Sequence, residues 1–264
     1  MTEIKKSFFP VFEWTRPSSA ILGGFSLSEE KLGYNNQYLS YLEELSNHIP
    51  VLYFADDESK KNIESGIKCS NIIFYNYKLN SIWIRDYAPI WLQCSDTLDY
   101  KLVNFPYGAN HFGKNEQDDN FSLKLSEVVG IPLAIDFPRK QIPFYFDGGN
   151  IFVDEDRNCF TSIRIDDPPI EYREKLLAHI NCDKIIAMHA IPGEPTGHVD
   201  TFMKILPNKK VLLAKYEKAD LNLEMIKNKS ILENLNYEVI KVSHSDMDEC
   251  TNWSYLNSLV VEEK

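Results

Sequence analysis

The sequence has no long apolar segment. Its 264 residues include no uninterrupted hydrophobic run near the roughly 18 residues that a membrane-spanning helix needs. A short apolar patch at 8–12 is broken by Pro10, and no small-residue cleavage site follows it, so we do not expect a secretory signal peptide. We therefore predict a cytoplasmic protein that has no membrane partner.

Cysteine and histidine are both scarce. The five cysteines are odd in number and scattered, with no C-x-x-C pair, and they stand at positions 69, 94, 159, 182 and 250. This spacing favours neither a disulfide framework nor a zinc cluster. For a metal site we would expect more His or Cys at close spacing, and the six histidines do not provide it. We predict no metal.

Positive charge is also in short supply. The chain has 28 Lys and Arg against 39 Asp and Glu, which gives a formal net charge of −11. An acidic chain is a poor partner for nucleic acid or for an anionic membrane, and it is compatible with a cationic ligand. Hydrophobic residues at 44% and charged residues at 25% are ordinary for a soluble globular protein of one large domain or two small ones.

The most informative stretch is 197–206, which reads as a strand that ends at the turn residues 207–208. Residues i and i+2 of a strand point to the same face, so we expect His198 and Asp200 to project together. A histidine beside a carboxylate is a usual acid/base pairing. The plain alternative is a solvated His and Asp at the start of a strand, because a short motif has little specificity on its own.

Two other stretches place charge inside apolar sequence. The segment 81–92 reads as an aromatic, β-branched strand with Arg85 and Asp86 in its middle. Adjacent charges there are costly unless each finds a partner or a ligand, although an ion pair at the end of a strand is the simpler interpretation. In 144–154, Asp147 closes an aromatic strand, two glycines follow, and a second strand begins. A Gly-Gly pair occurs in many hairpins, so this motif alone is weak.

Helix and strand patterns alternate along the rest of the chain. Apolar residues at helical spacing predict helices, and short apolar runs between turn residues predict strands. The expected helices cover 36–49, 56–65, 119–129, 169–180 and 219–235. The remaining expected strands cover 18–25, 51–54, 71–75, 101–105, 132–137, 159–163, 183–188, 210–214, 237–242 and 253–261.

A polar residue recurs in the strands that open successive sections, at intervals of about 50 to 60 residues. These residues are Asp86, Asp147, His198 and Asn257, and each section reads roughly as strand, strand, helix, strand. Such units suggest quasi-repeats around a centre. A radial arrangement would bring the first three residues and Asp200 into one cleft. The expected aromatic walls of this cleft are Trp83, Tyr87, Phe146 and Phe202.

A cluster of three carboxylates and one histidine calls for a cation. Without one, the carboxylates would repel each other and take up protons. Carboxylates bind a guanidinium by bidentate, charge-assisted hydrogen bonds, and aromatic walls suit an organic cation. The shortage of histidine and cysteine favours an organic cation over a metal ion.

The motifs resemble those of one known family. The segments 83–89, 147–150 and 197–200 are similar to three successive motifs of the agmatine deiminase and bacterial peptidylarginine deiminase family, within the guanidine-modifying (pentein) superfamily. Glu13-Trp14 and the segment 255–257 also match its pattern in the right order. Five ordered matches are far more specific than any one of them, and the resemblance covers nearly the whole chain.

The resemblance implies a fold and an activity. The implied fold is a pentein-type five-fold α/β-propeller of strand-strand-helix-strand repeats, in a single domain over 1–264. The implied reaction is hydrolysis of a guanidine to a ureido product with release of ammonia, without a metal or an organic cofactor. The partner would be a small cationic guanidine such as agmatine or arginine, or a peptide arginine. A homodimer is common in the resembled family.

The resemblance also assigns roles to residues. A cysteine thiolate would attack the guanidinium carbon, His198 would transfer protons, and Asp86 and Asp200 would hold the two nitrogen ends. Asp147 stands where agmatine-type members often have Glu, and we expect it to orient the substrate. The other expected substrate-binding residues are Trp83, Arg85, Gly148 and Gly149.

The sequence departs from the family at one point. The nucleophilic cysteine of the family lies in a Gly-rich His-Cys motif beyond the segment 255–257, and this sequence stops at Lys264 without it. Cys250 is the nearest cysteine, but its acidic neighbours disfavour a thiolate. We therefore expect an incomplete fifth repeat and a chain truncated at the C-terminus with crippled catalysis. Two alternatives stay open, a guanidine-binding protein without activity and a metal-dependent hydrolase using His198, Asp86 and Asp200. Amidinotransferase chemistry would need the same cysteine.

Overall fold

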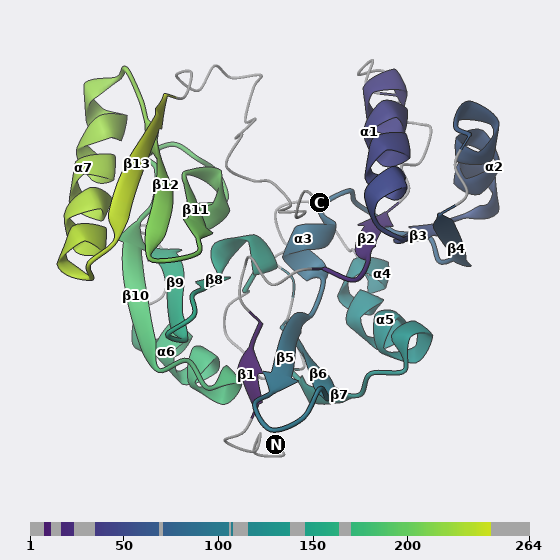
Figure 1. Cartoon of the computed structure of the whole chain (residues 1–264), viewed down its shortest axis with the longest axis horizontal. Coiled ribbons are helices and arrows are strands. Elements are labelled where there is room, and N and C mark those ends of the chain that lie inside the picture. The colour runs from purple at the N-terminus through teal and green to yellow at the C-terminus, as the bar shows by residue number, and fades with distance from the viewer. Residues whose placement is uncertain are drawn as a thin grey trace.

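The described part of the chain contains four small sheets and the helices that connect their strands. The computed structural model describes residues 8–11, 17–23, 35–68, 71–105, 107, 116–137, 146–163 and 170–243. Figure 1 shows the sheets spread around a central region in which the short helix α3 lies. The protein is therefore a mixed α/β protein, as the sequence predicts.

The first sheet is wholly parallel. Its strands β2 (Ala20–Gly23), β3 (Val51–Ala55) and β4 (Ile72–Asn76) lie in that order. Parallel neighbours need a long crossover, and helices α1 (Asn35–His48) and α2 (Asp57–Gly66) provide the two crossovers. Both helices start and end within one or two residues of the positions expected from the sequence.

The other three sheets share one pattern. Each is built from two antiparallel strands, a helix, and a third strand parallel to the second. The first unit holds β5 (Ile90–Cys94), β6 (Tyr100–Asn104), α5 (Phe121–Val129) and β7 (Leu133–Asp136). The second holds β8 (Phe152–Val153), β9 (Asn158–Ile163), α6 (Ile170–Leu177) and β10 (Lys184–His189). The third holds β11 (Met203–Leu206), β12 (Lys210–Lys215), α7 (Ala219–Asn234) and β13 (Glu238–Ser243). The strand-strand-helix-strand repeat is thus confirmed for three successive sections.

Smaller elements complete the described structure. Strand β1 (Phe8–Pro10) adds to the first unit antiparallel to β5. Helix α4 (Glu116–Asp119) precedes α5, and the 3-10 turn η4 (Ala178–Ile180) follows α6. Among the described residues, no helix combines the length and the apolar content that crossing a membrane requires.

A short helical turn precedes the first strand of each unit. These turns are α3 (Ile84–Tyr87), η3 (Gly148–Asn150) and η5 (Val199–Thr201). The sequence predicted continuous strands over 81–92 and 197–206. This was wrong for the first part of each segment, which forms a helical turn, and the strand covers only the later part. A short apolar run indicates burial but cannot distinguish a buried turn from a strand, and Pro89 ends α3 before β5 begins.

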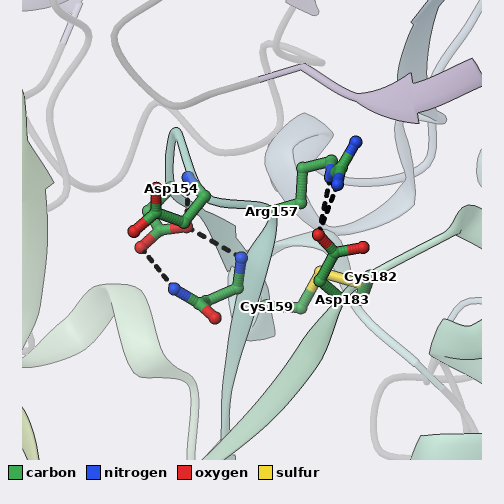
Figure 2. Close-up of a disulfide and its surroundings, with 7 residues drawn as sticks. Asp154, Arg157, Cys159, Cys182 and Asp183 are labelled. Carbon is green, nitrogen blue, oxygen red and sulfur yellow. Dashed lines mark hydrogen bonds and ion pairs between the residues drawn. A yellow bond between two sulfur atoms is a disulfide. The ribbon is translucent and has the colours of Figure 1, made fainter. Parts of the chain in front are cut away.

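A disulfide joins Cys159 and Cys182, whose Cα atoms are 5.8 Å apart (Figure 2). The cysteine spacing suggested no disulfide framework, and it did not anticipate this bond. The two cysteines are 23 residues apart in sequence, but the crossover through α6 returns the chain to a strand parallel to β9. The beginnings of β9 and β10 are then neighbours, with Asn158 opposite Lys184. Spacing along the sequence does not reveal this, because the pairing depends on the sheet.

We predict that the disulfide stabilises the second unit. Replacing Cys159 and Cys182 together by Ser should lower the free energy of unfolding by about 3 kcal/mol, because the bond closes a loop of this length in the unfolded chain. Urea unfolding of both proteins without reductant measures the difference. The matched control is Cys94→Ser, since Cys94 is a partly buried cysteine that does not take part in this disulfide. Identical wild-type unfolding with and without dithiothreitol would contradict the prediction.

Candidate active site

His198 lies between two carboxylates. Its Nδ1 is 3.3 Å from Asp86 Oδ1, and its Nε2 is 3.1 Å from Asp147 Oδ2. The histidine side chain is only 7% exposed, while those of Asp86 and Asp147 are 14% and 22% exposed. Both ring nitrogens face acceptors, so the arrangement suits an imidazolium that donates from each nitrogen.

Gly149 lies at the point where these groups meet. Its backbone N–H donates to Asp86 Oδ1 at 3.1 Å. A Cβ on this glycine would lie 2.5 Å from Asp86 Oδ1, 2.7 Å from His198 Nδ1 and 2.8 Å from Asp200 Oδ2. Asp86, His198 and the buried Asp200 therefore converge on one Cα atom that carries no side chain. Gly148 is equally confined, because a Cβ there would collide with the backbone carbonyl of Arg85.

The four residues that the sequence places in one cleft are thus together, and we call them the acidic cluster: Asp86, Asp147, His198 and Asp200. They come from the three turns rather than from strands. Asp86 lies in α3, and Asp147 immediately precedes η3. His198 immediately precedes η5, and Asp200 lies within it. Turn α3 contacts η3, and η3 contacts η5, so the repeat of turn and strand assembles the cluster.

The carboxylates determine the protonation state of His198. Burial lowers the pKa of the imidazole, but hydrogen bonds to Asp147 and Asp86, together with their negative charge, outweigh burial and hold its pKa well above the usual range. His198 is therefore protonated near neutral pH. Three carboxylates and one imidazolium leave a net negative charge in the acidic cluster, which suits a bound cation.

A buried glutamate shapes the loop before His198, and no sequence pattern marks it. Glu194 Oε1 accepts from the Thr196 N–H at 3.1 Å and from its hydroxyl at 2.8 Å, and Glu194 Oε2 accepts from the Gly197 N–H. The Thr196 hydroxyl in turn accepts from the His198 N–H at 3.2 Å. An acidic residue between Gly193 and a proline normally reads as a solvated loop residue.

The remaining predicted binding residues lie near the turns. Trp83 precedes α3 and is 54% exposed. Arg85 places its guanidinium carbon 5.4 Å from the ring centre of Phe152, and Lys204 Nζ lies 5.6 Å from the same ring. Binding of a substrate by Trp83 and Arg85 stays a prediction.

Three of the four expected aromatic walls belong to the hydrophobic cores. Tyr87 packs in the cluster that contains Phe54 and Phe121, and its hydroxyl donates to the Ser81 carbonyl at 2.8 Å. Phe146 and Phe202 are buried in two other clusters. The wall prediction was wrong for these residues, because their side chains are almost fully buried and expose no surface to a ligand.

The cysteines of the described residues do not line the acidic cluster. Cys159 and Cys182 are joined to each other, and Cys94 borders a separate cavity of about 550 Å³ near β1 and the β8–β9 turn. Cys250 lies outside the described residues, as do Glu13-Trp14 and Asn257. Within the described ranges, no group of three or more His, Cys, Asp or Glu side chains has the arrangement of a metal site.

The fold and the acidic cluster define a mixed α/β protein with an imidazolium held among carboxylates. Residues 24–264 match the family model of the Porphyromonas-type peptidyl-arginine deiminases, and the chain belongs to this family. This agrees with the resemblance that the sequence motifs carry.

Solved structures show the same fold. A substrate-bound variant of the agmatine deiminase of C. jejuni superposes with a TM-score of 0.80 at 18% identity, over 96% of this chain and 80% of that chain. The agmatine deiminase of Enterococcus faecalis, in a structure described as catalysing its reaction, gives 0.79 at 16% identity, over 97% of this chain and 81% of that chain. At such identities the likeness establishes the fold and no more.

We predict that Gly149→Ala disrupts the acidic cluster. The new methyl group would overlap Asp86, His198 and Asp200, so at least one must move. The expected result is a His198 ring that titrates nearer its ordinary pKa, measured by NMR of the imidazole. Gly66→Ala is the control, because its Cβ would meet only the mobile end of Leu39. A variant with wild-type His198 titration would contradict the prediction.

We also predict a pH-dependent contribution of His198 to stability. A raised pKa in the folded state means that the contribution is fully present below the unfolded value of about 6.5 and is lost as the pH rises through the folded pKa. The free energy of unfolding of wild-type protein minus that of His198→Gln should therefore shrink above about pH 6.5. Chemical denaturation between about pH 5.5 and 9.5 measures it. Parallel curves across this range would contradict the prediction.

Proposed function

We propose that the acidic cluster binds the guanidinium group of agmatine, arginine or peptidyl-arginine, and that it serves the hydrolysis of this group to a ureido product and ammonia. The observation that supports this most is the position of His198 between Asp86 and Asp147, with Asp200 on the same glycine. Membership of a deiminase family supports the same reaction class.

The carboxylates fit the binding step. A guanidinium presents five N–H donors in a plane, and carboxylates accept them in pairs. Asp86 and Asp200 reach Gly149 from α3 and η5, and we assign them to the two nitrogen ends of the guanidinium. Asp147 lies on the far side of His198 and orients the substrate from there. A cation in this position offsets the negative charge of the cluster.

The protonated His198 fits the chemical step. In the proposed reaction a thiolate adds to the guanidinium carbon, and the C–N bond to the leaving nitrogen breaks as His198 gives it a proton. Ammonia leaves, and an S-alkylthiouronium remains. Water then adds to the same carbon, and neutral His198 takes one proton from it. The C–S bond breaks as the second water proton passes to solvent, which gives the ureido product and the thiolate. The described residues supply binding and proton transfer, and we assign the nucleophile to a cysteine outside them.

A second function is binding of guanidines without hydrolysis. The observation that favours it is that the described cysteines do not line the acidic cluster. A metal-dependent hydrolase using His198, Asp86 and Asp200 is the third hypothesis, and inhibition by a chelator distinguishes it from the other two.

Four wider predictions accompany the function. We propose that the three units belong to a five-fold α/β-propeller, that 1–264 form one domain, and that the protein assembles as a homodimer in the cytoplasm. The three successive units support the propeller. The disulfide between Cys159 and Cys182 favours an oxidising compartment, so the cytoplasm has the least support of the four.

The decisive experiment combines turnover with binding. Ammonia and ureido product are measured from agmatine, arginine and a peptide with C-terminal arginine, with and without EDTA, and calorimetry measures binding of each. We expect His198→Ala to lose about 100-fold or more in rate, as for loss of a general acid-base group. His189→Ala is the matched control, because this histidine pairs with Glu224 at 3.2 Å and is 47% exposed.

Each outcome separates the hypotheses. Equal amounts of ammonia and ureido product, lost in His198→Ala and kept in His189→Ala, support deimination. Binding that His198→Ala or Asp86→Asn weakens, without turnover, supports the binding function. Turnover that EDTA abolishes supports the metal-dependent hydrolase. Neither binding nor turnover with any of the three guanidines would overturn the proposal.

A further inference from the structure

A buried pair of side chains holds the backbone on both sides of His198. The Val199 N–H, just after the histidine, donates to Asn150 Oδ1 at 3.2 Å. The carbonyl of Gly197, just before it, accepts from the hydroxyl of Ser162. The peptide groups that flank His198 are therefore fixed by two residues that do not belong to the acidic cluster.

The two residues are also bonded to each other. Asn150 Oδ1 accepts from the Ser162 N–H at 2.9 Å, and Asn150 Nδ2 donates to the Ser162 carbonyl at 3.2 Å. The Ser162 hydroxyl lies 3.1 Å from Asn150 Oδ1, but its single proton suits the Gly197 carbonyl, because Asn150 Oδ1 already accepts two N–H bonds. Both side chains are buried, so each lost bond would leave a polar group unsatisfied away from water.

Asn150 also links the turns that carry the acidic cluster. It is the last residue of η3, one residue after Gly149 and three after Asp147. Through Ser162 it is tied to the end of β9, and through Val199 it is tied to η5. A shift of Asn150 would therefore move His198 relative to Asp147 and to the Gly149 N–H that binds Asp86.

We propose that Asn150, together with Ser162, is a positioning residue that sets the distances from His198 to its two carboxylates. Asn150 acts through the backbone of η5 and does not touch the substrate. Its effect on turnover rests on the proposed deimination, whereas its effect on the geometry of His198 does not.

The chain provides a matched control in a second buried asparagine. Asn228, in α7, accepts from the His189 N–H at 2.8 Å and donates to the His189 carbonyl at 2.9 Å. Asn228 therefore binds the N–H and the carbonyl of a residue at the end of β10, as Asn150 binds the N–H and the carbonyl of Ser162 near the end of β9. Its loss should cost a similar amount of stability, but His189 pairs with Glu224 rather than with the acidic cluster.

The test is an NMR titration of the His198 imidazole in wild-type protein, Asn150→Ala, Ser162→Ala and Asn228→Ala, with thermal melting of each. We expect the pKa of His198 to fall by about one unit or more in Asn150→Ala, because longer contacts to the carboxylates weaken their hold on the proton. Ser162→Ala should shift it in the same direction by less, since only the Gly197 bond is lost. Asn228→Ala should lower the melting temperature without moving the titration.

The results separate a positioning role from a structural one. Unchanged His198 titration in Asn150→Ala and Ser162→Ala, with melting temperatures lowered as in Asn228→Ala, would overturn the proposal. If Asn150→Ala does not fold, the titration of Ser162→Ala decides. Where agmatine is turned over, kcat should fall about 10-fold or more in Asn150→Ala, with a smaller change in KM, because proton transfer depends on the position of His198. A protein without turnover would leave the titration result valid and would refute only the proposed deimination.

Discussion

The pairing of His198 with two carboxylates is the constraint to which the central turns conform. A buried imidazolium is costly alone, and so are buried carboxylates that have no cation. Here the carboxylates of Asp86 and Asp147 each lie within 3.3 Å of a ring nitrogen of His198, which requires α3, η3 and η5 to meet. The meeting point leaves no room for a side chain at Gly149. A side chain at Gly149 would push the charged groups apart, so the charge balance of the acidic cluster depends on glycine at this position.

A second polar group fixes the other end of the same strands. Asp154 follows β8, and its buried carboxylate accepts from the Asn158 N–H at 2.7 Å and from Lys209 Nζ at 3.0 Å. Lys209 lies in the turn after β11, and the Tyr237 hydroxyl, just before β13, also donates to Asp154. The second and third units are thus joined at their hairpin turns as well as at η3 and η5. Two anchored ends limit how far β8 and β11 can slide, which keeps Asp147 and His198 in register.

The sequence predicted the repeat and the membership of the acidic cluster, because both depend on local patterns. Period and composition located helices such as 219–235, and unusual charges in apolar runs marked Asp86 and Asp147. What it could not predict depends on tertiary packing and on pairing between residues far apart in the sequence. The turn at α3 looked like a strand, the disulfide of Cys159 with Cys182 needed the register of β9 with β10, and the grip of Asn150 on Val199 spans 49 residues. Tyr87 was misjudged for the same reason, since only tertiary packing reveals that its side chain is buried in a core.

The resting protonation state gives the proposed chemistry a direction. With both ring nitrogens donating to carboxylates, His198 enters the reaction as an acid, so departure of ammonia can precede activation of water. Once the proton is gone, one ring nitrogen becomes an acceptor beside a carboxylate, and that contact turns repulsive unless water or substrate supplies a donor. The site therefore favours the step that returns a proton to His198. Binding alone does not require a histidine that gives up a proton and takes one back. Carboxylates without an imidazolium between them would be enough to bind a guanidinium. The presence of His198 among them is the feature that argues for catalysis over binding.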